Sequence, residues 1–146
     1  MIVGQFESVL DEKKRTALPK KFRSELGADI VITKGLEKNL IIVPELQWRT
    51  LLEGTEGRPF FERNVRNLQR FLLGNATEIQ LDTKGRFVLP DYLKEYAGIE
   101  KDIIFIGVGR FVEIWDTKEW HKHEAEMTKN GMIAIIAEKL TGGGNE

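Results

Sequence analysis

The chain of 146 residues has no cysteine and only two histidines. The missing cysteine excludes a thiol nucleophile. His121 and His123 are two residues apart on an expected helix, so they point to different faces, and we expect neither a metal site nor a cofactor. There is also no glycine-rich phosphate loop, and no pair of carboxylates is placed for acid–base chemistry. These absences argue against an enzyme.

Long apolar runs are missing too, which excludes a membrane-spanning helix. The first residues lack the basic region and apolar stretch of a secretory signal. With 41% hydrophobic and 31% charged residues, the composition is that of a globular protein and not of a disordered one. We therefore expect a folded, cytoplasmic protein.

The net charge of −1 gives little information about partners, because the charge is unevenly distributed. Residues 10–23 have a local balance of +4, whereas residues 81–94 have only +1 and the end of the chain is acidic. A basic front of this kind is compatible with nucleic-acid binding despite the mild total.

An internal repeat organises the chain. Residues 10–19 read LDEKKRTALP and residues 81–90 read LDTKGRFVLP, so that Leu, Asp, Lys, Arg, Leu and Pro recur 71 positions apart. Similarity at a fixed period indicates a duplicated unit. Each copy spans about 50 residues, too few to be comfortably stable alone, and we expect the two copies to share one core.

Each copy predicts the order β-β-α-β-β. Pro19 and Pro90 precede short helices at 19–26 and 90–97, each ended by a glycine. Strand pairs follow at 30–33 with 40–43 and at 103–106 with 111–115. The turn in the second copy has Gly85 where a hairpin often needs a positive φ. Lys14 stands there in the first copy, at a cost of order 1 kcal/mol if its φ is positive.

Helices are expected to flank the two copies. One begins at Pro44 and ends near residues 54–57, and an amphipathic helix spans 59–73, with arginines at 63, 66 and 70 that more often face solvent than bind a ligand. A capping box at 116–119 predicts a helix to about residue 130, and 132–140 predicts a last one. The expected divisions are residues 1–53, 54–73, 74–130 and 131–146, the last with a flexible tail.

The Asp-x-x-x-Arg sequence of each turn allows two interpretations. In the first, Asp11 and Asp82 accept turn N–H groups and pair with Arg15 and Arg86 for purely structural reasons. In the second, the turns present these arginines to guanine edges in the DNA major groove, and nearby lysines contact phosphates. Both hold if each aspartate orients its arginine. The expected phosphate contacts are Lys13, Lys14, Lys20, Lys21 and Lys84.

The order of these motifs resembles the MraZ family of bacterial transcriptional regulators over about residues 1–125. The resemblance rests on GQFESVLD at 4–11, LPKKFR at 18–23, ITKGLEK at 32–38, LDTKGR at 81–86, YAGI at 96–99 and EIWD at 113–116. The positions that match the family motif are Asp11, Arg15, Asp82 and Arg86, and Lys14 departs from the glycine usual there.

The resemblance implies an α+β fold in which two AbrB-like swapped-hairpin units close a small β-barrel. It further implies a ring-shaped homo-oligomer, such as an octamer, that is nucleoid-associated and binds tandem repeats of promoter DNA in the division and cell-wall gene cluster. A rival function is an AbrB-like interaction protein, antitoxin-like or scaffolding, without operator binding. From its greater charge, we expect the first turn to contribute more phosphate affinity than the second.

Overall fold

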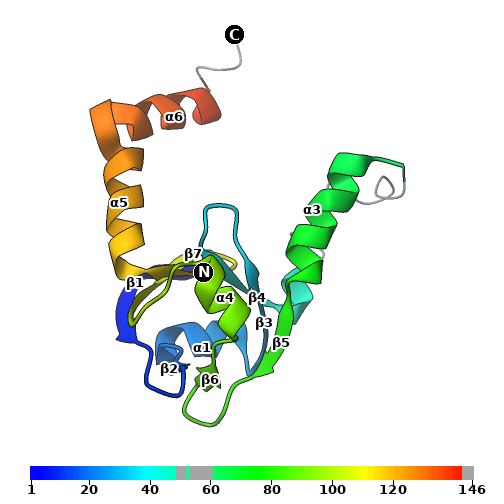
Figure 1. Ribbon diagram of the computed structural model, residues 1–146. Helices are drawn as coiled ribbons and strands as arrows, with labels where there is room; N and C mark the ends of the chain where they lie inside the picture. Colours follow the sequence, from blue (N-terminus) through cyan, green and yellow to red (C-terminus); the bar gives the residue numbers. More distant parts are fainter. Residues whose placement is uncertain (49–51, 53–60, 143–146) are drawn as a thin grey trace. The chain divides into compact units, whose positions relative to one another are not determined.

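A computed structural model describes residues 1–48, 52 and 61–142. By internal contacts the chain divides into two compact units, Met1–Asp116 and Thr117–Glu146. The described strands all belong to the first unit (Figure 1). Among the described residues, no helix is both long and apolar enough to cross a membrane.

The expected β-β-α-β-β order is confirmed in both copies. The first copy contains β1 (Ile2–Val9), β2 (Arg15–Ala17), α1 (Lys20–Leu26), β3 (Asp29–Lys34) and β4 (Leu40–Pro44). The second copy contains β5 (Thr77–Gln80), β6 (Arg86–Val88), α4 (Asp91–Tyr96), β7 (Asp102–Gly109) and β8 (Val112–Asp116). Each short helix begins one residue later than expected, because Pro19 and Pro90 keep the extended ψ of a cap residue.

The two copies exchange strands. Six strands form one sheet in the order β1-β7-β8-β4-β3-β5, and β2 pairs with β6. β1 of the first copy therefore pairs with β7 of the second, and β5 of the second pairs with β3 of the first. If each strand is replaced by its counterpart in the other copy, the same strand order results when the sheet is read from its opposite edge. The duplication seen in the sequence thus becomes a pseudo-two-fold axis between β4 and β8.

The expected closed barrel is not found in the part of the chain that the structure describes. The six-stranded sheet is open and ends at β1 and β5. The three-residue strands β2 and β6 pair with each other, and so they do not connect these edges. The result is an α+β arrangement of an open antiparallel sheet, a two-stranded ribbon and helices.

One hydrophobic core serves both copies, as their small size predicts. Phe22 of α1 and Phe105 of β7 have no exposed surface, and the buried cluster draws on residues from Ile2 to Ile114. Phe22 and Leu26 are four residues apart, so both reach the core from one face of α1. Phe6 packs edge-on against Phe22 with ring centroids 5.0 Å apart. The two halves of the sequence therefore stabilise each other.

The flanking helices differ in detail from the sequence predictions. After Pro44 the described backbone forms a short 3-10 turn, η1 (Glu45–Gln47), while residues 49–51 and 53–60 of the expected segment lie outside the described residues. The connecting helix α3 spans Arg63–Gly74 and so begins later than the expected residue 59, and Phe61 before it is largely exposed. Leu72 is buried, and its carbonyl oxygen accepts a hydrogen bond of 2.6 Å from the Thr33 hydroxyl.

The second unit is helical. It contains α5 (Thr117–Thr128), a 3-10 turn η2 (Lys129–Gly131) and α6 (Met132–Thr141), close to the predicted ranges. Asn130 and Gly131 have left-handed backbone angles, which separates the two helices. α6 has five large apolar side chains that are between 42% and 80% exposed, namely Met132, Ile133, Ile135, Ile136 and Leu140.

Candidate nucleic-acid interface

Each Asp-x-x-x-Arg sequence folds into a loop that is organised by its aspartate. In the second copy, Asp82 Oδ1 accepts the backbone N–H groups of Lys84 at 2.9 Å and Arg86 at 2.8 Å, and Oδ2 accepts Arg86 Nε at 2.7 Å. Asp11 makes the same three bonds in the first copy, to Lys13 N, Arg15 N and Arg15 Nε. The structural interpretation of the aspartates is therefore correct in its geometry.

These bonds stabilise the charged form of both aspartates. The backbone N–H of Arg86, followed by its side chain, lowers the pKa of Asp82 from 3.8 to about 2. The pKa of Asp11 is also lowered, chiefly by the backbone N–H of Arg15. A hydrogen bond donated to a carboxylate favours its ionised state. Both loops therefore keep an anionic centre at neutral pH.

The aspartates use only one edge of each guanidinium. The ion pairs join Nε to the carboxylate, and no other hydrogen bond or ion pair of the Arg15 or Arg86 side chains is found within the described residues. The Arg15 and Arg86 side chains stay 43% and 49% exposed. The terminal nitrogens of both arginines thus remain available as a forked pair of donors.

The two loops are brought together by the β2–β6 ribbon. Arg15 lies opposite Val88, and Ala17 lies opposite Arg86. Alternation along a strand places these four exposed residues on one face, while Thr16 and Phe87 are buried on the other. The two arginines are therefore diagonal neighbours on the outer face, and both loops project from the same side of the first unit (Figure 1).

The predicted lysine contacts fall into different surroundings. Lys13, Lys20 and Lys84 are exposed. Lys21 is exposed too, with its ammonium 6.0 Å from the centre of the Phe6 ring. Lys14 instead forms an ion pair with Asp91 at the start of α4. This pair joins the first loop to the second copy, a contact between residues 77 apart that the local sequence pattern does not predict.

Lys14 has the same left-handed backbone as Gly85, with which it aligns. Its φ is 61°, and that of Gly85 is 76°. Both loops also share a backbone bond from the fourth residue back to the aspartate carbonyl, 2.9 Å long in each. The turn geometry is thus preserved despite the substitution, at the cost in backbone strain that a lysine with positive φ carries.

Sequence reasoning did not identify Arg23 as a neighbour of the second loop. It lies on α1 of the first copy, but its side chain covers Gly85 of the second loop. A signal was present, because Arg23 belongs to the basic stretch 10–23. What the sequence did not reveal is which loop it accompanies.

The other polar candidates are less well placed. On α3, Arg70 donates to Asn67 Oδ1 at 2.9 Å. His121 lies 3.9 Å from a Glu124 carboxylate oxygen, and no group of three metal-ligating side chains occurs among the described residues. Arg70 is thus engaged on its own helix, and it makes no hydrogen bond or ion pair with Arg15 or Arg86 among the described residues.

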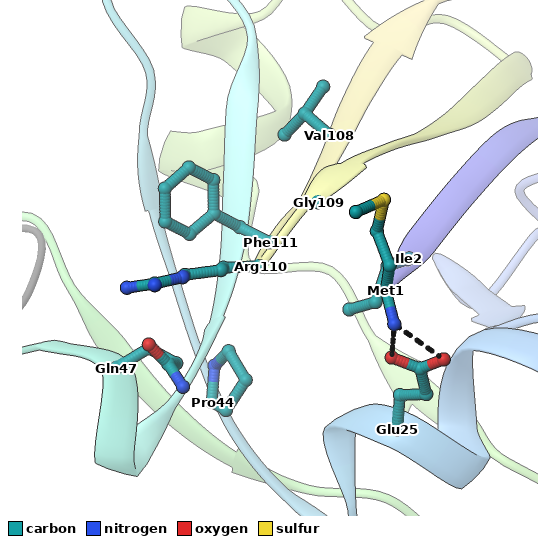
Figure 2. Close-up of a pocket in the computed structure, with 9 residues that line it drawn as sticks. All are labelled: Met1, Ile2, Glu25, Pro44, Gln47, Val108, Gly109, Arg110 and Phe111. Carbon is teal, nitrogen blue, oxygen red and sulfur yellow. Dashed lines mark hydrogen bonds and ion pairs between the residues drawn. The ribbon is translucent and has the colours of Figure 1, made fainter.

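A pocket of about 640 Å³ lies elsewhere in the first unit (Figure 2). Pro44, Gln47, Phe111 and Arg110 line part of it, and the Glu25 carboxylate within it is paired with the Met1 amino group at 2.9 Å. A smaller hollow of about 440 Å³ borders the ribbon and includes Arg15 and Arg86. The exposed arginines and the hollow beside them make the ribbon the stronger candidate site.

Comparison with known proteins gives a consistent result. A family described as "MraZ protein, putative antitoxin-like" matches the chain twice, at residues 1–71 and 72–141. These two matches agree with the pseudo-two-fold axis of the fold.

Individual relatives cover between 82% and 97% of the chain. The chain is 44% identical over 120 residues to "Transcriptional regulator MraZ" of Syntrophomonas wolfei, covering 82% of this chain and 84% of the relative. It is 39% identical over 142 residues to the protein of the same name from Clostridium acetobutylicum, with 97% of each covered. The Acetivibrio thermocellus protein of that name is 36% identical over 140 residues, with 96% of each covered. These relatives are named as regulators and not as enzymes. The chain therefore belongs to the MraZ family.

Proposed function

We propose that this protein is a DNA-binding transcriptional regulator that inserts its β2–β6 ribbon into the major groove of duplex DNA. The observation that carries the proposal is the shared face of Arg15 and Arg86, each held through Nε with its terminal nitrogens free. The major groove admits a two-stranded ribbon, and an arginine fork matches O6 and N7 of guanine. The names of the relatives support the regulatory role.

In this proposal each aspartate positions its arginine, and the arginine contacts the base edges. Fixing one edge of a guanidinium reduces the rotamer freedom that binding would otherwise remove. The lysines Lys13, Lys20, Lys21 and Lys84 contact backbone phosphates, which set register and contribute most of the sequence-independent affinity. Lys14 contributes when DNA displaces its exposed ion pair with Asp91, since such surface pairs stabilise little.

The operator we propose is a set of tandem short repeats in the promoter of the division and cell-wall gene cluster, as the family resemblance implies. A single ribbon with a few contacts binds weakly at physiological salt. Subunits joined in a ring that meets repeated sites raise avidity by on the order of 10²–10⁴. The exposed apolar side chains of α6 support self-association.

The test is a footprint and gel shift with the DNA upstream of the protein's own gene. Protection of regularly spaced short repeats, lost in a variant with both Arg15→Ala and Arg86→Ala, supports the proposal. Binding that does not distinguish this DNA from unrelated duplex contradicts it.

A second candidate is an oligomeric interaction protein, antitoxin-like or scaffolding. The description of the matching family and the exposed apolar residues of α6 favour it. The same gel shift separates the two functions, because an interaction protein retains its oligomeric size but leaves the upstream DNA unshifted.

A further inference from the structure

The exchange of strands also exchanges the neighbours of the two loops. The backbone N–H of Leu18, just before α1, donates to the Gly85 carbonyl of the second loop at 2.9 Å. Its counterpart Leu89, just before α4, donates to the Lys14 carbonyl of the first loop at 2.8 Å. Each loop is thus supported by the helix start of the other copy.

Arg23 of α1 lies directly on the second loop. A Cβ atom added to Gly85 would be 2.2 Å from Arg23 Cδ and 2.6 Å from its Nε. Gly85 is buried although Lys84 and Arg86 beside it are exposed. The absence of a side chain at residue 85 therefore makes the space that the Arg23 stem occupies.

The residues that correspond to Gly85 and Arg23 differ in the other copy. Lys14 has a side chain at the position that corresponds to Gly85, and Lys94 corresponds to Arg23. The Lys14 ammonium pairs with Asp91. The Arg23 cation therefore lies against the second loop, and the Asp91 carboxylate lies against the first.

Along the sequence the first loop lies in the more basic stretch, but the contacts in the fold favour the second loop. Loop 82–86 has two cations and one carboxylate, and Arg23 adds a third cation. Loop 11–15 has three cations and two carboxylates, and Asp91 adds a third carboxylate. With these two contacts counted, the second loop has the larger excess of positive charge.

The guanidinium of Arg23 has donors to spare. Its Nε is buried without a hydrogen-bond partner. Its two terminal nitrogens are not among the buried atoms that lack a hydrogen-bond partner, and no acidic side chain pairs with Arg23 within the described residues. A solvent-reaching guanidinium beside a candidate DNA-reading arginine fits a phosphate oxygen, which accepts such a fork in charge-assisted bonds.

We propose that Arg23 is a DNA phosphate contact of the second loop, which makes that loop the electrostatically stronger half of the ribbon. The inference rests on the proposed DNA binding. It reverses the expectation that the first loop contributes more phosphate affinity, which rested on the greater charge of the first copy in the sequence.

The test compares Arg23→Met with Lys94→Met, the matched position of the other copy. Methionine keeps an unbranched stem over Gly85 and removes the charge. The affinity of the full chain for duplex DNA from upstream of its own gene is measured by fluorescence anisotropy between 50 and 200 mM salt. Melting temperature and oligomer size are recorded for each variant.

We expect Arg23→Met to make the slope of log affinity against log salt shallower by about 0.9 for each lost phosphate contact. The ratio of affinities at 50 and 200 mM salt then falls about 3.5-fold for each contact. Lys94→Met should leave the slope unchanged. An unchanged slope in folded Arg23→Met, or equal changes in both variants, overturns the proposal and leaves Arg23 as a cover for Gly85.

If Arg23→Met does not fold, Arg23→Lys and Arg23→Gln replace it. The lysine variant should keep most of the slope that the glutamine variant loses, and equal slopes in these two overturn the proposal. Failure of the underlying function is distinguishable, because the unmodified protein would then not prefer the upstream DNA.

Discussion

Asp82 fixes Arg86 twice, through the backbone N–H at 2.8 Å and through Nε at 2.7 Å. The same carboxylate therefore shapes the loop and orients the guanidinium. Asp11 and Arg15 repeat the relationship in the first copy, at 2.8 and 3.0 Å. A short loop with one carboxylate at its centre is enough to present an arginine in a fixed direction.

Asp82→Asn should weaken binding to upstream DNA by about tenfold, the lower part of the range for one good arginine–base pair. An asparagine still accepts the backbone N–H groups, but its amide then faces Arg86 Nε donor to donor, or the reverse if the amide flips. The measurement is anisotropy at fixed salt, with Thr83→Ala in the same loop as the control. Equal affinity of Asp82→Asn and the unmodified protein would show that the arginine needs no orientation.

The hydrogen bonds that Asp82 accepts in loop 82–86 should persist unchanged between pH 8 and pH 5. The folded-state pKa of Asp82 is lowered from 3.8 to about 2, so its stabilising bonds are fully present above about pH 4 and are lost as the pH falls towards 2. Asp11 shifts in the same direction. Amide exchange or chemical shifts of Lys84 and Arg86 across this range provide the check. A transition near pH 6 would contradict the assignment of these bonds to the aspartates.

Lys14→Gly should raise the free energy of unfolding by up to about 1 kcal/mol, because glycine adopts a φ of 61° without the strain of a Cβ. The lost ion pair with Asp91 offsets little of this gain. Denaturant unfolding measures the change. Gly85→Ala is the converse control. It should lower the free energy of unfolding, since an alanine at residue 85 would have to adopt a positive φ and its Cβ would clash with Arg23. Destabilisation by Lys14→Gly would show that the Asp91 pair outweighs the strain.

Phe22→Ala should cost about 3–5 kcal/mol, the usual range for removing a fully buried phenylalanine. Because the core cluster includes residues of both copies, residues 1–116 should still unfold in one transition. Circular dichroism and denaturant titration of the full chain test this. Two separated transitions, with only one moved by the substitution, would show that the copies fold independently.

Local patterns predicted the elements well and their partners less well. The 71-residue period identified both Asp-x-x-x-Arg loops, and proline and glycine placed α1 and α4 within one residue. Periodicity reports local structure, however, and does not state which segments pair. The β2–β6 ribbon, the open sheet, the Lys14–Asp91 pair and the position of Arg23 all depend on contacts between the copies.

The limit of sequence-based prediction is clearest in the assignment of charged residues to the two loops. Arg23 and Lys14 lie in one basic stretch of sequence, yet Arg23 covers the second loop and Lys14 pairs with the second copy. Summing charge along the chain therefore does not reveal which loop Arg23 accompanies. The relative phosphate affinity of the two loops stays a prediction for the salt experiment.

The central claim is that two aspartate-held arginines on one ribbon bind specific DNA. Its most direct test is the affinity of the unmodified protein, Arg15→Ala and Arg86→Ala for the DNA upstream of its own gene, against a scrambled duplex. We predict that each variant loses at least tenfold in affinity for the upstream DNA, within the range of one bidentate arginine–base contact, about 1–3 kcal/mol, while melting temperature and oligomer size are retained. Folded variants that bind the upstream DNA as tightly as the unmodified protein would contradict the claim.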